Sequence, residues 1–242
     1  MTTDNHLFSD EFQFLVLGGS GGLGREVARL IPNASNWSLD TRVDLSDDKS
    51  VTRAVRELVR PVSGIVNCAG INRLAKFDDV TWEDFTATMN INAFALVRVV
   101  QALRRWEVSF GRPRLLAGSP ICNVVSNAAH VPMSNSLAYG ASKSSAEMIT
   151  RQMARELKEY CVFGCNPNKL HKTSMSKKIE EQVLALRGWT ADEAERYQLA
   201  ALPAGVETPP SSVARLIVEL CNPVHHPYIT SCIFDYGGPV SR

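Results

Sequence analysis

Short apolar runs alternate with longer amphipathic stretches along most of the chain. The first run, 12–17, ends in a cluster of glycines and is typical of a buried strand. A helix is predicted over 22–30, and it stops before Pro32 because a residue that precedes proline disfavours the helical conformation. The same order of strand and helix then recurs toward the C-terminus.

The later elements follow this alternation. We expect strands at 37–39, 64–67, 121–126 and 228–234, a further strand that includes Val43, helices at 47–60, 82–106, 138–160, 176–186 and 191–202, and a loop over 107–119. Alternation of this kind implies a parallel sheet with helices on both faces, and ligands of such sheets bind beyond the carboxyl ends of the strands. The expected fold class is therefore α/β, a single-domain Rossmann-type doubly wound parallel sheet that occupies residues 1–242.

Composition and charge narrow the functional classes. A hydrophobic fraction of 45% and a charged fraction of 21% are ordinary for a globular protein, and a net charge of +1 favours neither nucleic acid nor an anionic membrane. No apolar run approaches the roughly 18 residues that span a bilayer, and the polar start of the chain does not resemble a signal peptide. The six cysteines form no C-x-x-C pair, so we expect free thiols, no metal site and a cytoplasmic protein.

The glycines after the first strand form a candidate phosphate site. The segment reads Gly18-Gly19-Ser20-Gly21-Gly22-Leu23-Gly24. Glycine lets the backbone turn sharply and approach a pyrophosphate, and the start of the following helix offers unpaired N–H groups and the positive end of its dipole. A plain tight turn has a similar composition, but the position between a strand and a helix favours dinucleotide binding.

An acidic residue about 20 positions after such a loop would bind the adenosine ribose. Asp40 lies 22 residues after Gly18 (40 − 18), at the end of the predicted second strand. A carboxylate accepts hydrogen bonds from both ribose hydroxyls and repels a 2′-phosphate, so Asp40 favours NAD over NADP. Arg42 could instead pair with that phosphate, and Asp40 could be a plain turn residue, so NADP stays open.

Tyr139 and Lys143 carry the candidate chemistry. They are four residues apart on a predicted helix and therefore share one face, although a surface helical pair has the same spacing. A phenol titrates at about 10, and a nearby ammonium together with an oxidised nicotinamide would lower that pKa toward the working range. Ser126 ends the preceding predicted strand, and its hydroxyl could hold the substrate oxygen against the tyrosine.

These motifs, in this order, resemble the short-chain dehydrogenase/reductase family, in its short single-domain branch. The resemblance extends over about 12–238. The matching residues are Gly18, Gly22 and Gly24 in the glycine motif, Asp44 and Leu45 beside the adenine, Asn67, Ala69 and Gly70 in the N-x-A-G segment, the helix asparagine Asn92, and the Ser126, Tyr139 and Lys143 set.

The resemblance implies a role for each of four side chains. Tyr139 would donate or take the hydroxyl proton, Lys143 would lower its pKa and bind the nicotinamide ribose, and Ser126 would orient the substrate oxygen. Asn92 would hold a water that links Lys143 to solvent, although a local hydrogen bond is the alternative. The hydride would pass directly between the substrate carbon and the nicotinamide.

The chain departs from the family at several positions. Leu17 replaces the usual threonine before the first glycine, and Pro167-Asn168 replaces Pro-Gly, where asparagine tolerates the left-handed conformation better than most residues. Thr173 is the nearest candidate to contact the nicotinamide carboxamide. The segment 168–210 would cover the substrate, and such loops often order on binding.

The basic residues near the start of this segment have two interpretations. Lys169, His171 and Lys172 form either a solvated basic loop or a site for an anionic substrate group. Ala128 and His130 follow Ser126 and are expected to line the substrate pocket. The resemblance also implies a homodimer or homotetramer formed through the two long helices.

Three functions are weighed. The first is an NAD(P)-dependent oxidoreductase that acts on a carbonyl or secondary alcohol of a small molecule. The second is a catalytically silent dinucleotide-binding sensor or scaffold, which the retained tyrosine and lysine disfavour. The third is an epimerase or dehydratase, but relatives of that kind usually carry a longer C-terminal substrate domain.

Overall fold

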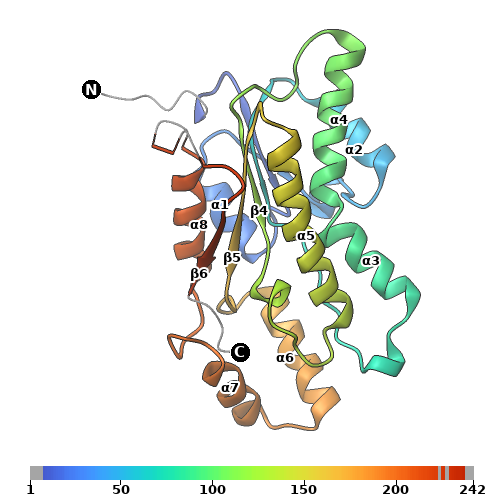
Figure 1. Cartoon of the computed structure of the whole chain (residues 1–242), viewed down its shortest axis with the longest axis vertical. Coiled ribbons are helices and arrows are strands. Elements are labelled where there is room, and N and C mark those ends of the chain that lie inside the picture. The colour runs from blue at the N-terminus through green and yellow to red at the C-terminus, as the bar shows by residue number, and fades with distance from the viewer. Residues whose placement is uncertain (1–7, 223–224, 227–228, 238–242) are drawn as a thin grey trace.

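Six parallel strands form one sheet at the centre of the computed structural model, which describes residues 8–222, 225–226 and 229–237 (Figure 1). In sheet order the strands are β2 (Ala34–Trp37), β1 (Gln13–Leu17), β3 (Val62–Asn67), β4 (Pro120–Val124), β5 (Cys161–Pro167) and β6 (Ile233–Tyr236). The chain moves outward from β1 to β2 and then crosses back to β3. This reversal beside β1 is the switch point at which sheets of this kind bind ligands.

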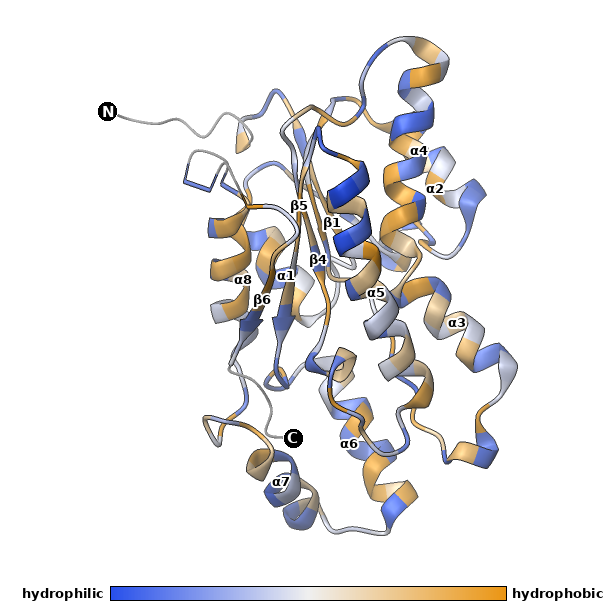
Figure 2. Cartoon of the chain, in the orientation of Figure 1, coloured by the Kyte–Doolittle hydropathy of each residue, from blue (hydrophilic) through white to orange (hydrophobic). Residues whose placement is uncertain are grey.

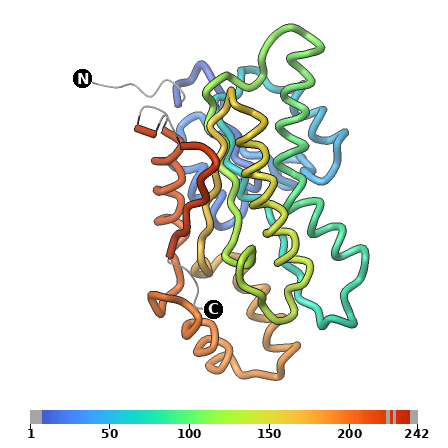
Figure 3. The backbone as a smooth tube through the Cα atoms, viewed as in Figure 1, coloured from blue at the N-terminus to red at the C-terminus, as the bar shows by residue number. Residues whose placement is uncertain are grey.

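Helices cover both faces of the sheet, as predicted. α1 (Gly22–Leu30) packs against α8 (Pro210–Leu220) on one face, while α2 (Asp48–Glu57), α4 (Ala95–Phe110) and α5 (Leu137–Glu156) cover the other, with α3 (Trp82–Asn92) beside α5. α6 (Ser174–Arg187) and α7 (Ala191–Ala200) form the orange lobe below the carboxyl ends of the strands (Figure 3).

Two hydrophobic cores lie on the two faces of the sheet. Phe14 and Val16 of β1 belong to the core beneath α1 and α8, whereas Leu15 and Leu17 belong to the core beneath α2, α4 and α5. Successive side chains of a strand point to opposite faces, so a continuous apolar run serves both cores. Figure 2 shows the central strands as hydrophobic along most of their length.

The helix predicted over 82–106 is two helices. α3 ends at Asn92 and α4 begins at Ala95, and between them the N–H of Phe94 donates to the carbonyl of Met89 at 3.3 Å. The side chain of Asn92 is bonded to the backbone of Ile71, which fixes the break beside the loop after β3. Hydropathy does not register such a contact, because it depends on a residue distant in sequence.

The region after the first helix also differs from prediction. β2 ends at Trp37 instead of beginning there, and residues 39–41 form the 3-10 helix η2 (Leu39–Thr41). Val43 belongs to no strand, because its N–H donates to the carbonyl of Ser38 in a tight turn. The polar residues of β2 carry no apolar signal, which explains the error.

The remaining elements follow the predicted order with changed ends. The loop expected over 107–119 begins later, because α4 continues to Phe110, and α8 had no counterpart in the prediction. The last strand begins at Ile233, and Tyr228 of the expected 228–234 strand lies outside the described residues. The six cysteines, all within the described residues, form no disulfide. In the described part of the chain, none of the helices combines the length and apolarity that crossing a membrane requires.

Candidate active site

α5 and the loop after β4 bring three predicted catalytic side chains together. Tyr139 and Lys143 lie one turn apart near the start of α5, and Nζ of Lys143 is 5.8 Å from the centre of the Tyr139 ring. Ser126 lies two residues beyond β4 and forms a hydrogen bond with the Tyr139 phenol. Its hydroxyl also accepts from the N–H of Ala128 at 3.2 Å, which starts the 3-10 helix η4 (Asn127–Ala129).

Burial shifts the pKa values of both Tyr139 and Lys143. It raises the pKa of Tyr139 above its ordinary value, and the hydrogen bond from Ser126 offsets part of that rise. It also lowers the pKa of Lys143 from 10.5 to about 8, because a buried ammonium is poorly solvated. Nζ of Lys143 donates to the carbonyl of Val124 at 2.9 Å. That Lys143 and a bound oxidised nicotinamide together lower the pKa of Tyr139 stays a prediction.

Asn92 holds the loop that follows β3. Its Nδ2 donates to the carbonyl of Ile71 and to Oγ of Ser142, both at 2.9 Å, and its Oδ1 accepts from the N–H of Ile71 at 2.8 Å. Both amide protons are therefore engaged, and the side chain is buried. These are the local hydrogen bonds that we considered as the alternative to a water relay.

The glycine loop has the geometry that a diphosphate requires. Gly18 has a φ of +74°, and a Cβ there would lie 2.8 Å from Cα of Ala69. A Cβ on Gly24 would lie 2.3 Å from the carbonyl oxygen of Gly18. No side chain caps α1, and within the described residues the N–H groups of Gly22, Leu23 and Gly24 have no hydrogen-bond partner. These donors fit the phosphates of a dinucleotide.

Asn36 and Ser38, which the sequence analysis missed, contact this loop. Oγ of Ser20 is 2.8 Å from Oγ of Ser38 and accepts from Nδ2 of Asn36 at 3.0 Å. A Cβ on Gly19 would lie 2.5 Å from Oδ1 of Asn36. Both residues stand at the carboxyl end of β2, so a correct assignment of that strand would have indicated them.

The structure places Asp40 and Arg42 beyond the end of β2, whereas Asp40 was predicted at the end of the second strand. Asp40 lies in η2, three residues beyond the end of β2, and is exposed. Arg42 adopts a φ of +63° and is also exposed. Neither side chain has a hydrogen bond or ion pair with another described residue, so both could bind a ligand beside the switch point.

The predicted adenine-side residues are held by hydrogen bonds to Ser46 and Arg98. Oδ1 of Asp44 accepts from the N–H of Ser46 at 2.8 Å and from its hydroxyl at 2.6 Å. Leu45 is buried in the core beneath α2 and α4, and its carbonyl accepts from Arg98 at 2.7 Å. These bonds fix the backbone between η2 and α2.

A buried polar chain supports the N-x-A-G segment. Nδ2 of Asn67 donates to Oδ1 of Asn123 at 2.9 Å, and Nδ2 of Asn123 donates to Oγ1 of Thr150 at 2.9 Å. Oδ1 of Asn67 accepts from the N–H of Ala69 at 3.2 Å. The chain links β3, β4 and α5, so it holds the glycine-loop side of the site against the helix that carries Tyr139.

Gly70 lies where Asn92, Lys143 of α5 and the start of α6 come together. A Cβ on Gly70 would lie 3.4 Å from Oδ1 of Asn92, 3.8 Å from Nζ of Lys143 and 3.9 Å from Cε of Met175. Met175 was not predicted as a site residue, because a methionine in a helix is usually a core residue. The first turn of α6 therefore reaches the centre of the candidate site.

The start of the covering segment also differs from expectation. Asn168 is not among the described residues with positive φ; its Nδ2 donates to the carbonyl of Gly237 at 2.7 Å, and its Oδ1 accepts from Asn127 at 3.0 Å. It therefore closes the turn after Pro167 by hydrogen bonds rather than by a left-handed backbone. Oγ1 of Thr173 accepts from the N–H of Ser176 at 3.0 Å and so caps α6.

The histidine and lysine candidates are paired with carboxylates. Nε2 of His130 is 2.7 Å from Oε2 of Glu147 on α5, which positions the ring along that helix. Nζ of Lys169 is 2.5 Å from Oε1 of Glu207, and Nδ1 of His171 is 2.9 Å from Oε2 of the same carboxylate. Lys169 is therefore already paired, whereas His171 and Lys172 are exposed, and the choice between a solvated basic loop and a site for an anionic substrate group stays a prediction.

A doubly wound parallel sheet with a glycine loop at its switch point defines a Rossmann-type protein. The short chain dehydrogenase family matches residues 32–184, which is more than half of the chain and includes Asn92, Ser126, Tyr139 and Lys143. The chain therefore belongs to the short chain dehydrogenase family. The glycine loop precedes the matched residues, so its assignment rests on its geometry.

Individual relatives agree with this placement. An L-xylulose reductase of Mesocricetus auratus is 28% identical over 163 residues, which are 67% of this chain and 61% of that protein. The chain thus matches about three fifths of the length of this relative. A dehydrogenase/reductase from Sinorhizobium meliloti 1021 has a TM-score of 0.80 at 22% identity and 98% coverage of both chains. A short chain dehydrogenase from Burkholderia cenocepacia J2315 in complex with NADP has a TM-score of 0.76 at 23% identity, with 95% and 98% coverage.

Proposed function

We propose that the protein is an NAD(P)-dependent oxidoreductase that interconverts a carbonyl and a secondary alcohol of a small molecule. The observation that carries the proposal is the meeting of Tyr139, Ser126 and Lys143 beside Gly70, next to the uncapped start of α1. Ligands of such sheets bind at this edge. Membership of a dehydrogenase family supports the same reaction class.

The chain's own residues account for proton handling and orientation. The phenol of Tyr139 is held in its protonated form by burial, so it can donate a proton to a substrate oxygen that becomes an alcohol. Ser126 lies within hydrogen-bonding reach of that phenol and would hold the same oxygen. Lys143 has a pKa of about 8 and can exchange a proton near neutral pH. When bound, the dinucleotide would supply the hydride acceptor or donor.

The glycine loop would hold the diphosphate, and the residues after β2 would select the cofactor. NAD is the preferred cofactor in this proposal, because Asp40 presents an unpaired carboxylate and residues 18–24 contain no lysine or arginine. A carboxylate at this place accepts from ribose hydroxyls and repels a 2′-phosphate. Arg42 is the residue that would favour NADP instead.

Turnover measurements test the proposal. Purified protein is offered NAD or NADP with a panel of secondary alcohols, and NADH or NADPH with ketones and ketoses, while the absorbance of the reduced nicotinamide is followed. Tyr139→Phe should reduce the rate by about 10² to 10⁴-fold, the usual contribution of a general acid. Dinucleotide binding without turnover across the panel would favour the silent sensor, and failure to bind any dinucleotide would refute the proposal.

We further propose that the protein assembles as a homo-oligomer and is located in the cytoplasm. Apolar side chains on the two long helices are exposed, with Val108 and Phe110 on α4 and Met148 on α5 at 88%, 62% and 65%. Burial of such side chains between two copies would favour a homodimer or homotetramer, which light scattering after size exclusion will test. Cysteines without disulfides among the described residues suit a reducing compartment such as the cytoplasm, which fractionation will test.

A further inference from the structure

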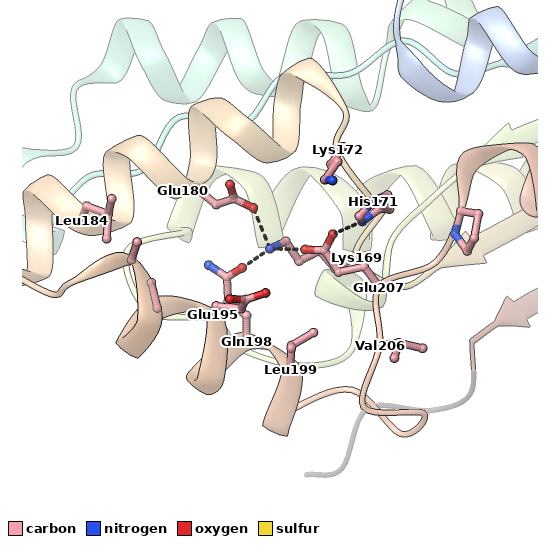
Figure 4. Close-up of a pocket in the computed structure, with 13 residues that line it drawn as sticks. Lys169, His171, Lys172, Glu180, Leu184, Glu195, Gln198, Leu199, Val206 and Glu207 are labelled. Carbon is pink, nitrogen blue, oxygen red and sulfur yellow. Dashed lines mark hydrogen bonds and ion pairs between the residues drawn. The ribbon is translucent and has the colours of Figure 1, made fainter.

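One ammonium group joins the two helices of the covering segment to the end of β5. Figure 4 shows Nζ of Lys169 among Glu180 of α6, Gln198 of α7 and Glu207, which lies before α8. Nζ is 2.9 Å from Oε1 of Glu180 and 2.5 Å from Oε1 of Glu207, and it also donates to Oε1 of Gln198. Lys169 follows the last residue of β5, Pro167, by two positions, so its side chain connects three separate segments to the sheet.

The Lys169–Glu207 pair is less exposed to solvent than an ordinary surface ion pair. The side chains of Lys169 and Glu207 are 21% and 15% exposed, and partly buried charges are screened less by solvent. Burial raises the pKa of Glu207, but hydrogen bonds from Lys169 and His171 outweigh it, and the pKa falls below its ordinary value. The backbone supports the arrangement, because the N–H of Thr208 donates to the carbonyl of Lys169 at 2.9 Å.

Little hydrophobic packing holds the same helices. Ser176 is the buried residue of α6, and Ala194 is the buried residue of α7. A cavity of about 610 Å³ lies between the helices and is lined by apolar side chains such as Leu184 and Leu199 (Figure 4). Because helices are normally fixed by an apolar face, the polar cluster around Lys169 must contribute much of what positions these two.

The other end of α6 lies over the proposed dinucleotide site. A Cβ on Gly22 would be 2.5 Å from Cγ2 of Thr173, so the methyl group of this threonine contacts the glycine loop. Met175 reaches Gly70, as described above. Oε1 of Gln182 accepts from the N–H of Leu74 at 2.8 Å, which ties α6 to the loop after β3. The position of α6 therefore decides how far the site is covered.

We infer that Lys169 is a positioning residue that holds α6 and α7 closed over the dinucleotide site by gathering acceptors from both helices and from Glu207. The inference rests on the proposed function for the identity of the covered ligand. Lys169 is not an anion site, because its ammonium is already surrounded by three acceptors. Loss of these bonds releases the covering segment and lets a dinucleotide enter and leave faster.

Hydrogen–deuterium exchange of the full chain without any dinucleotide tests the structural half. In Lys169→Met, peptides from α6 and α7 should exchange about 10-fold faster, the change expected when hydrogen bonds to a charged group are lost. Peptides from α4 should exchange as in the wild type. Lys178→Met is the matched control, because Lys178 is exposed on α6 and its side chain has no hydrogen bond or ion pair with other described residues. Lys169→Arg should restore most of the protection.

A second variant guards against misfolding of the first. Glu180→Gln removes the charge that α6 offers and leaves the Lys169–Glu207 pair intact, so exchange should accelerate in α6 and much less in α7. Unchanged exchange in both Lys169→Met and Glu180→Gln would overturn the inference. Equal acceleration in Lys178→Met would do the same.

Stopped-flow measurement of NADH and NADPH release tests the functional half. In Lys169→Met the dissociation rate should rise about 10-fold, and KM for the dinucleotide should change more than kcat. Faster exchange with an unchanged dissociation rate would overturn the coupling between the cluster and the site. If the wild type binds no dinucleotide, the proposed function fails, while the exchange experiment still decides whether Lys169 positions the two helices.

Discussion

The methyl group of Thr173 lies against Gly22, so closely that a Cβ atom on the glycine would be 2.5 Å from Cγ2 and 2.8 Å from Cβ of the threonine. Thr173 is the N-cap of α6, and Gly22 is the first residue of α1. The two residues are 151 positions apart (173 − 22), and their contact brings the covering segment onto the proposed phosphate loop. The absence of a side chain at Gly22 is thus a requirement of packing as well as of phosphate approach.

Gly22→Ala is expected to destabilise the closed arrangement. The added methyl group must displace Thr173, and overpacking of this kind costs about 1–3 kcal/mol. Urea unfolding measures the loss in the free energy of unfolding. Hydrogen–deuterium exchange should show that the loss of protection is concentrated in the first turn of α6. Gly21→Ala is the control, since the nearest atom to a Cβ there is the carbonyl oxygen of Gly18 at 3.4 Å. Equal losses in the two variants would contradict the contact.

Asn92→Ala is expected to loosen the loop after β3. The substitution leaves the partly buried N–H and carbonyl of Ile71 without their partners, which costs about 1–3 kcal/mol. We expect this loss in urea unfolding together with reduced turnover, because Gly70 beside Lys143 would no longer be held. Thr86→Ala on the exposed side of α3 should leave both quantities unchanged. If stability is kept while turnover falls, the water relay would be the better account of Asn92.

The lowered pKa of Lys143 predicts a pH dependence of stability. The folded protein releases this proton at about pH 8, whereas the unfolded chain keeps it to about 10.5, so the unfolded state binds more protons between these values. Stability contributed by Lys143 should therefore rise with pH across this window. Relative to Lys143→Met, the wild type should gain about 3–4 kcal/mol at most, at about 1.4 kcal/mol per pKa unit.

Urea unfolding of both proteins at several pH values measures that difference. Tyr139 is present in both, so its own titration above pH 10 cancels from the comparison. A difference that stays constant from pH 8 to 10.5 would show that the Lys143 ammonium is not destabilised by burial.

Cofactor preference is expected to depend on Asp40. Asp40→Asn removes the carboxylate that would bind the ribose hydroxyls and repel a 2′-phosphate, so kcat/KM with NAD should fall about 10-fold and that with NADP should rise. Arg42→Gln is the companion variant and should lower kcat/KM with NADP alone. If Asp40→Asn leaves the ratio of kcat/KM with NAD to kcat/KM with NADP unchanged, the ribose is bound elsewhere. Ser38, directly after β2, then becomes the next candidate for binding it.

Much of the fold could be predicted because its signals are local. The apolar run of β1 and the glycines that follow it fix a strand and the start of α1 with the bounds that the structure shows for that helix. β2 was misplaced because it reads Ala-Ser-Asn-Trp and is stabilised by pairing with β1, which hydropathy does not reveal. The break after Asn92 was missed for a similar reason, since it depends on bonds to Ile71.

By itself, the sequence determined the class of fold and which residue types could carry the chemistry, because strand and helix periodicity and the glycine loop are properties of neighbouring positions. Only the tertiary structure decided that Met175 reaches Gly70, that Asn36 lies against Gly19, and that Lys169 collects acceptors from α6 and α7. Each of these depends on the distance between residues far apart in the chain. Such distances follow from the packing of whole elements, which no local pattern encodes.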